Sequence, residues 1–305
     1  MKLRFWGVRG SIPCPGPETI KYGGNTACIE LRFDGLERII ILDAGSGIRD
    51  LAGSLLSHDL KRGPLNLKLF LTHTHLDHIL GFPFFVPLYI PNTRVKVYGP
   101  VTYEEESLQE VMAGQLSYRY FPVRLDQLLS HIEYVDLAEG VLDLGDGITL
   151  KTAFLNHSLL CLGYRFEWAG KVLCTAYDTE PFRNLFSGDV KDPSYDEVMA
   201  IEGEAAAQAA NQRIEDFLAD ADLLIHDTQY TQEEYEAGKI GWGHSSFDQA
   251  IAAARRARVK RLALFHHEPL RTDAQMDDLA RMYCTGGGNG EPEVFFAREG
   301  MEIEL

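Results

Sequence analysis

Four side chains that can bind a metal ion lie within six residues of one another, directly after an apolar stretch. They are His73, His75, Asp77 and His78, in the pattern H-x-H-x-D-H. Imidazole nitrogens together with a carboxylate are typical ligands of zinc, and manganese or iron can take its place. A chance polar loop would rarely combine these residue types at this spacing. The sequence therefore predicts a metal site in this segment.

Three further candidate ligands follow apolar stretches elsewhere in the chain. His157 follows the stretch from Ile148 to Leu155, Asp178 follows residues 171–177, and His266 follows residues 261–265. Side chains at the ends of strands can be held at one spot by a rigid scaffold. Taken alone, His157 would be read as a structural or surface histidine. Taken with the first motif, all three are expected to join the metal site.

With these motifs the chain resembles the metallo-β-lactamase fold superfamily, and within it the ribonuclease Z-like and phosphodiesterase branch. The resemblance covers nearly the whole length. Besides the histidine motif it rests on Gly7–Pro13, Tyr22–Thr26, Leu42–Gly47, Tyr177–Thr179, His226–Thr228, Gly243–Ser246 and Phe265–His267. The two motifs around Asp227 and His244, in the long segment between Asp178 and His266, favour phosphodiester chemistry over glyoxalase II-like chemistry.

The resemblance implies two divalent metal ions, for which zinc is the expected metal. One ion would be bound by His73, His75 and His157. The other would be bound by Asp77, His78 and His266, with Asp178 bridging the two. Class B lactamases lack the last histidine of the first motif, so His78 favours a site with two ions.

Catalysis is assigned to Asp77, His244 and Asp227. Two adjacent divalent ions lower the pKa of water toward neutrality and polarise a phosphoryl oxygen. His244 is the candidate for helping the leaving alkoxide, and Asp227 would accept a proton from its other ring nitrogen and fix its tautomer. The alternatives are a loop histidine that caps or packs, and a turn aspartate.

Substrate binding is assigned to Asn25, Arg119 and His244. Arg119 lies in the aromatic segment Tyr118–Val123, after the first metal motif. Its neighbours could offer aromatic faces to a base, and Arg119 could contact a phosphate. The alternative for this segment is a packing or dimer loop.

Several other polar residues near these motifs receive structural roles. Asp43 follows a strand of isoleucines and is expected to orient a ligand histidine, although a turn role is equally open. His267 follows His266 on a strand and should face the opposite way, so we exclude it from the ligands. The remaining histidines, His58, His131 and His226, have no converging partners in the sequence.

The elements that must position these residues alternate between strands and helices. Strand-like runs occur at Leu3–Val8, Cys28–Phe33, Arg38–Asp43, Leu67–Leu71 and Val95–Tyr98, and Ala169-Gly170 predicts a tight hairpin. Capping boxes at Thr102/Glu105, Ser246/Gln249 and Thr272/Gln275 mark helix starts, a long helix is expected over Tyr195–Leu218, and Gly286–Gly290 predicts a turn before a final strand pair. We predict an α/β fold, a four-layer αββα metallo-β-lactamase sandwich, with the metal site at one edge of the two sheets.

Composition is that of an ordinary enzyme with a sizeable core. The chain has 305 residues, 45% of them hydrophobic, and we expect a single domain over residues 1–305. No apolar run is long enough to span a membrane, and the N-terminus lacks the apolar core of a signal peptide. Five scattered cysteines indicate reduced thiols and a cytoplasmic location.

The net charge of the chain indicates which binding partners to expect. A net charge of −16 offers little for contacts with long nucleic acid, whereas the local charge of two metal ions suits a small anionic substrate. The basic, glycine-rich arm by which ribonuclease Z grips transfer RNA is not found; the segment between Asp178 and Asp227 is acidic and alanine-rich. Asp227 also replaces the usual glutamate of the histidine–acid motif. A homodimer remains open.

The sequence thus predicts a phosphodiesterase with two metal ions that acts on small, cyclic nucleotide-like substrates. Processing of RNA 3′ ends is the first alternative, and hydrolysis of a thioester or lactone is the second. A nucleotide-binding protein with little turnover is a third, which the complete ligand set disfavours.

Overall fold

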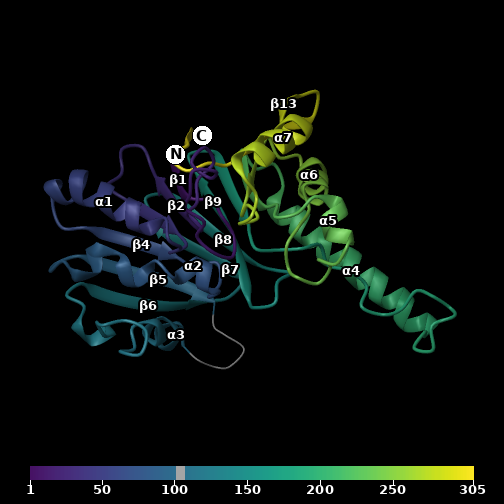
Figure 1. Ribbon diagram of the computed structural model, residues 1–305, viewed down its shortest axis with the longest axis horizontal. Coiled ribbons are helices and arrows are strands. Elements are labelled where there is room, and N and C mark those ends of the chain that lie inside the picture. The colour runs from purple at the N-terminus through teal and green to yellow at the C-terminus, as the bar shows by residue number, and fades with distance from the viewer. Residues whose placement is uncertain (101–106) are drawn as a thin grey trace.

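The chain folds into two β-sheets packed face to face between two layers of helices, as Figure 1 shows. The computed structural model describes residues 1–100 and 107–305. The first sheet has the strand order β15 (Glu302–Glu304), β1 (Lys2–Gly7), β2 (Cys28–Arg32), β3 (Ile39–Leu42), β4 (Asn66–Phe70), β5 (Arg94–Pro100), β6 (His131–Leu137). The second has the order β13 (Thr285–Gly288), β14 (Glu291–Phe296), β12 (Arg261–Phe265), β11 (Leu223–Asp227), β10 (Lys171–Ala176), β9 (Cys161–Trp168), β8 (Ile148–Leu155), β7 (Gly140–Gly145).

Helices cover the outer face of each sheet. The first sheet is covered by α1 (Ile48–His58), α2 (Leu76–Ile79) and α3 (Leu108–Gln115). The second carries α4 (Glu197–Leu218), α5 (Gln232–Glu236), α6 (Phe247–Arg256) and α7 (Asp273–Tyr283). None of the helices among residues 1–100 and 107–305 is long and apolar enough to cross a membrane.

Three hydrophobic layers hold the four structural layers together. The middle one lies between the sheets and joins Phe5 and Phe70 of the first sheet to Phe166 and Phe265 of the second. The other two lie between each sheet and its helices. The four residues of β3 alternate between the middle layer and the helix side, so all four are buried. This explains why the inner strands read as continuous apolar runs. The predicted αββα sandwich is confirmed.

Both sheets contain parallel strands, and the candidate ligands lie in the segments that follow the carboxyl ends of these strands. In the first sheet β3, β4, β5 and β6 are parallel neighbours, and in the second β10, β11, β12 and β14 are. Parallel strands present their carboxyl ends at one edge of a sheet, where functional residues can converge. The topology therefore brings the loops after several strands together.

Most of the expected local elements are present. Ala169 and Gly170 join β9 to β10 in a tight hairpin, and α4 covers the predicted long helix. The capping boxes begin α6 at Ser246 and α7 at Thr272. The box expected at Thr102 and Glu105 lies outside the described residues; α3 begins instead with a capping box at Ser107. Strands β6 and β7 were not predicted.

One local prediction was wrong. Residues Gly286–Gly288 were expected to lie in a turn, but they belong to the edge strand β13, which pairs with β14. The turn is limited to Asn289 and Gly290, both at positive φ, which suits a two-residue hairpin connection. The strand pairing comes from backbone hydrogen bonds to β14, for which side chains are not needed.

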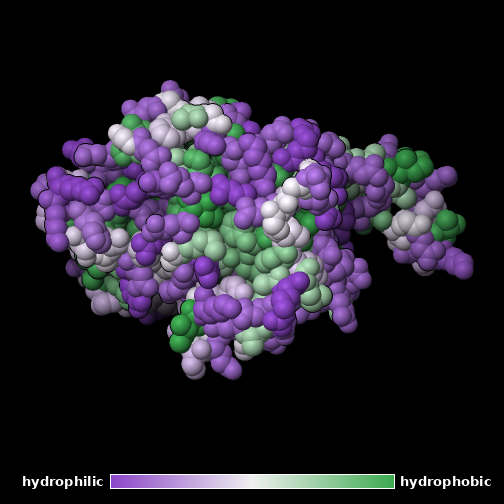
Figure 2. Space-filling view, turned by 90° about the horizontal axis from the view of Figure 1, so that it is seen from above, coloured by the Kyte–Doolittle hydropathy of each residue, from purple (hydrophilic) through white to green (hydrophobic). Residues whose placement is uncertain are grey.

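An arm projects from the second sheet's helical layer. It consists of the N-terminal half of α4 and the segment that precedes it, residues 184–207 (Figure 1). Leu185, Val190 and Ile201 are exposed on it, and Figure 2 shows hydrophobic residues at its end. Asp189 and Asp192 lie on the same segment. An arm is thus present, but it is acidic and partly apolar rather than basic.

Candidate metal centre

The two sheets bring seven predicted ligands to one place between their edges. His73 and His75 follow β4, and Asp77 and His78 lie in the short helix α2. The other three come from the second sheet: His157 follows β8, Asp178 follows β10 and His266 follows β12. Their ligand atoms form two groups that share Asp178, and a third group joins Asp178 and His266 to Asp227 and His244. Within each group all ligand atoms lie within 4.8 Å of one another.

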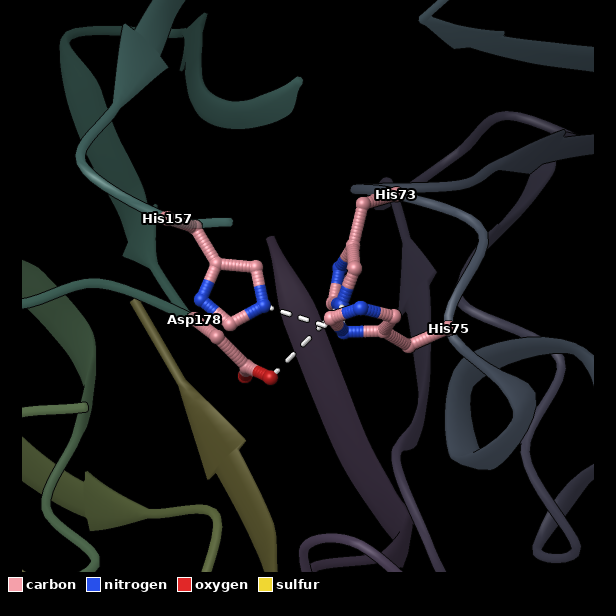
Figure 3. Close-up of side chains that lie close together, drawn as sticks. All are labelled: His73, His75, His157 and Asp178. Carbon is pink, nitrogen blue, oxygen red and sulfur yellow. Dashed lines mark hydrogen bonds and ion pairs between the residues drawn. The ribbon is translucent and has the colours of Figure 1, made fainter. Parts of the chain in front are cut away.

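The first group, which we call the nitrogen-rich cluster, consists of His73, His75 and His157 beside Asp178 (Figure 3). The Nδ1 atom of His75 lies 2.9 Å from His73 Nε2 and 3.0 Å from His157 Nε2. Three ring nitrogens thus meet at one point. Figure 3 shows that His157 and Asp178 approach from the second sheet, opposite the two histidines of the first.

The second group, the carboxylate-rich cluster, consists of Asp77, His78 and His266 beside Asp178. The Nε2 atom of His266 lies 3.2 Å from Asp77 Oδ2 and 3.3 Å from His78 Nε2. All of these side chains are buried. The backbone N–H of Ser11 also donates a hydrogen bond to Asp77 Oδ2, over 2.7 Å.

Asp178 lies between the two clusters. Its Oδ2 atom is 3.7 Å from His73 Nε2 and 3.3 Å from His78 Nε2, and its Oδ1 atom is 3.2 Å from His266 Nε2. Oδ1 is buried and has no hydrogen-bond partner among the described residues. A buried carboxylate oxygen without a partner is costly, and a cation would satisfy it.

Hydrogen bonds on the far side of two rings set the nitrogen that faces the centre. His157 Nδ1 donates to the carbonyl oxygen of Gly243 over 2.9 Å, so its Nε2 carries the lone pair. His78 Nδ1 donates to Asp43 Oδ2 over 2.7 Å, with the same result. Histidines that bind metals are oriented in this way. The expected contact of Asp43 with a candidate ligand histidine is present.

The protonation states also suit cations. Burial lowers the pKa of His73 and His157 and lowers that of His75 to about 4, so these rings are neutral and can donate lone pairs. In the other cluster burial lowers the pKa of His78, but the carboxylates of Asp77 and Asp178 raise it well above its usual value. The carboxylates thus favour positive charge at this point. The two clusters together fit two divalent ions.

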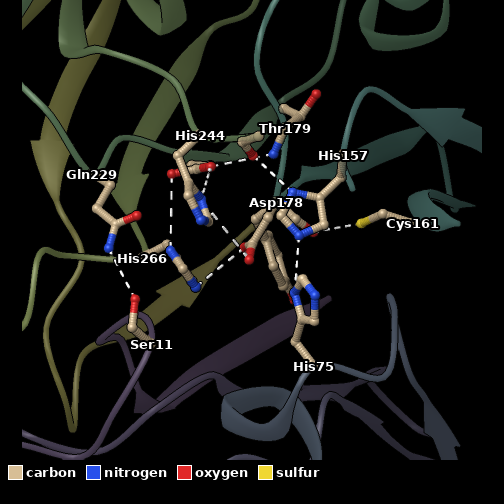
Figure 4. Close-up of polar contacts among 12 residues, drawn as sticks. Ser11, His75, His157, Cys161, Asp178, Thr179, Gln229, His244 and His266 are labelled. Carbon is tan, nitrogen blue, oxygen red and sulfur yellow. Dashed lines mark hydrogen bonds and ion pairs between the residues drawn. The ribbon is translucent and has the colours of Figure 1, made fainter. Parts of the chain in front are cut away.

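His244 lies directly beside the clusters (Figure 4), and Asp227 contacts its ring. Asp227 ends β11, and His244 lies in the loop before α6. His244 Nδ1 is 2.8 Å from Asp227 Oδ2 and 3.9 Å from Asp178 Oδ2, and its ring stacks on His266 with 5.0 Å between centroids. Its side chain is 13% exposed. The two residues therefore form a pair that reaches from a buried carboxylate to the surface of the site.

Two predicted substrate-binding residues are not brought to the clusters by any described contact. Asn25 donates to Glu299 Oε2 over 3.2 Å and accepts from Ser46 Oγ over 2.9 Å, so its amide joins structural segments. Arg119 is exposed, in the loop after α3. Both assignments remain predictions, and the contacts of Asn25 favour a structural role.

The other histidines take the places expected of them. His267 points away from the clusters and contacts the carbonyl oxygen of Ala297 through Nε2 at 2.8 Å. His58 and His131 are exposed, and His226 is buried against the backbone of Asp227. None belongs to a group of potential ligands among the described residues.

Sequence reasoning missed Glu180. This residue is buried two positions after Asp178, and its carboxylate accepts hydrogen bonds from the loop that carries His244. The only sequence signal is its place in Asp178-Thr179-Glu180, directly after a candidate ligand.

Comparison with known proteins identifies the family. Residues 38–267 match the family model described as the beta-lactamase superfamily domain. Because this match covers most of the chain, the chain belongs to the beta-lactamase superfamily. The fold and the relatives place it among the metallo-β-lactamase proteins, in the ribonuclease Z-like branch, as the motifs predicted.

Several relatives by sequence carry the name ribonuclease Z. The protein of that name from Streptococcus equi subsp. equi is 26% identical over 301 residues, covering 87% of this chain and 89% of its own. Among solved structures, the human short-form tRNase Z superposes with a TM-score of 0.61 at 20% identity over 100% of this chain and 99% of its own. A diphosphatase of the PhnP family gives a TM-score of 0.63 at 16% identity over 100% and 97%.

The family and these relatives indicate a metal-dependent hydrolase, and the histidine and aspartate clusters suit a centre with two metal ions. The ribonuclease names weaken our expectation that long nucleic acid is not a partner.

Proposed function

We propose that this protein hydrolyses small, cyclic nucleotide-like phosphodiesters. The observation that carries the proposal is the pair His244–Asp227, placed against Asp178 and the two clusters with one edge open to solvent. Such a pair beside a centre of two divalent ions serves a reaction in which a poor leaving group must be protonated. The departing alkoxide of a phosphodiester is a group of this kind.

We assign His73, His75 and His157 to one ion, Asp77, His78 and His266 to the other, and Asp178 to both. Zinc is the metal we expect, because imidazole nitrogens outnumber the carboxylates. When bound, the two ions supply a water of lowered pKa and polarise the phosphoryl group. The Oδ2 atom of Asp178 faces His73 of one cluster and His78 of the other, and its Oδ1 atom faces His266, so this carboxylate contacts ligands of both clusters.

His244 is the proposed general acid. Its Nδ1 donates to Asp227 Oδ2, and its Nε2 has no hydrogen-bond partner among residues 1–100 and 107–305. Burial lowers the pKa of His244, but Asp227 and Asp178 outweigh burial and raise it to about 9. In the metal-free protein the ring is therefore protonated near neutral pH, and Nε2–H is the proton that we assign to the leaving oxygen. Asp227 holds the ring in the orientation that this transfer needs.

Processing of RNA 3′ ends is the second candidate. Its support is the similarity to proteins named ribonuclease Z along 87% of this chain. The net charge of −16 and the acidic arm argue against it, because binding long nucleic acid depends on basic contacts to phosphates. We therefore rank small phosphodiesters first.

A substrate panel tests this ranking. Metal-loaded protein would be given cyclic nucleotides, bis(p-nitrophenyl) phosphate, a precursor transfer RNA and a thioester, with Asp178→Ala from the same purification as the control for contaminating activity. We expect cleavage of the small phosphodiesters at a far higher kcat/KM than any other substrate. Salt-sensitive cleavage of the precursor at its 3′ side, without action on cyclic nucleotides, would reverse the ranking.

We also propose that residues 1–305 act as one domain in the cytoplasm. Support for one domain comes from the middle hydrophobic layer, to which both sheets contribute. Support for the location comes from the five cysteines, all described and all free.

A further inference from the structure

One short loop contacts both a candidate metal ligand and the candidate general acid. The loop, residues 241–245, reads Gly-Trp-Gly-His-Ser and will be called the histidine loop. The carbonyl oxygen of Gly243 accepts the hydrogen bond from His157 Nδ1, and His244 follows directly. Gly243 has a φ of +80° and a side chain on it would collide with the ring of His157. The position of this loop therefore sets the orientation of both rings.

The carboxylate of Glu180 holds the histidine loop from one side. Its Oε2 atom accepts from the Gly241 N–H over 2.9 Å and from the Tyr235 hydroxyl over 2.8 Å, and its Oε1 atom accepts from the Gly243 N–H over 3.2 Å. Two residues of the loop are thus fixed by one side chain. Tyr235 belongs to α5, which ties the carboxylate to the helical layer.

Backbone groups of Thr179 and Glu180 also hold the histidine loop and its surroundings. The Ser245 hydroxyl donates to the carbonyl oxygen of Thr179 over 2.7 Å, and the Thr179 N–H donates to Asp227 Oδ2 over 3.2 Å. The Glu180 N–H donates to the carbonyl oxygen of Asn156, next to His157, over 3.1 Å. Thr179 and Glu180 therefore connect the histidine loop to Asp227 and to the segment that carries His157.

Three hydrogen-bond donors surround the buried carboxylate of Glu180. It forms no salt bridge with a side chain among residues 1–100 and 107–305, although the Arg183 guanidinium lies near the backbone of Gly241. A buried carboxylate without a counter-ion is costly unless it is fully hydrogen-bonded. Hydrogen bonds to an ionised acceptor are about twice as strong as neutral ones. Glu180 therefore gains its stability from the loop geometry, and the loop gains a rigid anchor.

We propose that Glu180 is a positioning residue that holds the histidine loop, and with it His157 and His244, in place beside the metal centre. This inference rests on the proposed function only for the catalytic role of His244. The structural part of it, that Glu180 fixes the loop, is independent of any substrate.

Glu180→Gln is the primary variant, because glutamine keeps the shape but puts an NH₂ group against backbone donors. We expect kcat to fall about 10–100-fold, as for other partners that orient ligands, with little change in KM and two ions retained when metal is supplied. The loss should shrink for p-nitrophenyl esters, whose leaving group needs little protonation. Glu233→Gln, on the exposed surface of α5, is the matched control and should behave as wild type.

A second readout needs no substrate. Trp242 lies in the histidine loop and is 56% exposed, so its fluorescence and its quenching by acrylamide report on the loop. Glu180→Gln should increase the quenching, and the increase should vanish when Trp242→Phe is added. Tyr235→Phe removes one donor and leaves the carboxylate in place, so it should give a smaller change of both readouts in the same direction.

The two readouts separate the possible failures. If the wild type cleaves no phosphodiester but Trp242 responds as expected, the proposed function is wrong and the anchoring role stands. If Glu180→Gln keeps the wild-type kcat and the wild-type quenching, the anchoring role is wrong. Should Glu180→Gln fail to fold, Tyr235→Phe decides alone, and wild-type values for it on both readouts would overturn the proposal.

Discussion

The two halves of the candidate metal centre differ in charge and in exposure. The nitrogen-rich cluster offers three neutral imidazoles, and two of them, His75 and His157, are only half-buried. The carboxylate-rich cluster is buried throughout and adds the charge of Asp77 to that of Asp178. One half is thus open and neutral, and the other closed and anionic.

This difference indicates a division of labour. Buried carboxylates close to each other need positive charge, so the carboxylate-rich cluster should hold its ion more tightly. The nitrogen-rich cluster faces solvent, so a substrate can approach from its side. His244 lies next to both, with its ring centroid 5.3 Å from that of His157 and 5.0 Å from that of His266. It is therefore placed to act on a group bound at the open half.

Removing the residue shared by the two halves should have the largest effect. Asp178→Ala deletes the one carboxylate among residues 1–100 and 107–305 that belongs to both clusters, so we expect loss of at least one ion per chain. Because each ion supplies several kcal/mol of transition-state stabilisation, activity should fall by more than about 10⁴-fold. Metal analysis of the purified protein, with Asp34→Asn as an exposed control, measures the first effect, and kcat/KM the second.

A fully active Asp178→Ala enzyme would falsify the assignment of two bridged ions. The wild type should contain close to two ions per chain in the same analysis. A wild type that holds only one ion at saturating metal would mean that the two halves do not both bind, and the comparison between them would lose its basis.

His244→Ala tests whether the residue beside both halves is an acid or a ligand. As the general acid its loss should lower kcat about 10²–10⁴-fold while both ions are kept. The penalty should be smaller for p-nitrophenyl esters than for alkyl esters. Asp227→Asn should give a smaller defect in the same direction, and His58→Ala, an exposed histidine, none. Loss of an ion, or an equal penalty for every leaving group, would assign His244 to the metals instead.

The sequence predicted which candidate ligands lie together better than it predicted the contacts around them. Candidate ligands at the ends of β4, β10 and β12 could be identified because each follows an apolar run that forms a buried strand. The contacts of Glu180 could not be read, because they join it to backbone groups of a loop some sixty positions away. Such contacts depend on how the loop packs, not on which side chains it carries.

The arm and the edge strand illustrate the same limit. The helix over residues 197–218 was expected from its composition, but its projection away from the sheet was not. Gly286–Gly288 were expected to form a turn because runs of glycine are typical of turns. In the structure they form a strand because they pair with β14. Asn25 was assigned from its motif, yet Glu299 and Ser46 occupy its amide. Motifs predict which residues matter, but contacts decide what they do.

Asp43→Asn should weaken the buried half more than the open half. Asp43 accepts directly from His78 Nδ1 over 2.7 Å, but it reaches His73 of the nitrogen-rich cluster through the Thr72 hydroxyl, which donates to Asp43 Oδ2 over 2.9 Å and lies 3.2 Å from His73 Nδ1. Replacing it should lower the affinity for the ion of the carboxylate-rich cluster about 10–100-fold and have a smaller effect on the other. Titration of the metal-free protein with zinc, followed by calorimetry, would resolve the two steps. Equal weakening of both steps would show that Asp43 affects the zinc affinity of both clusters alike.

Partial removal of metal should give the smallest and most direct contrast between the halves. Because His75 and His157 are half-buried and neutral, the ion of the nitrogen-rich cluster should leave first when a chelator is added at a limiting concentration. The ion of the carboxylate-rich cluster should follow more slowly, since its ligands are buried and two of them are charged. Stopped-flow chelation with a coloured zinc indicator should show two phases, and Asp43→Asn should speed the slow one more than the fast one. A single phase, or a greater acceleration of the first phase in Asp43→Asn, would contradict the proposed difference in exposure, because the ion that leaves first would then not be the one held by the open half.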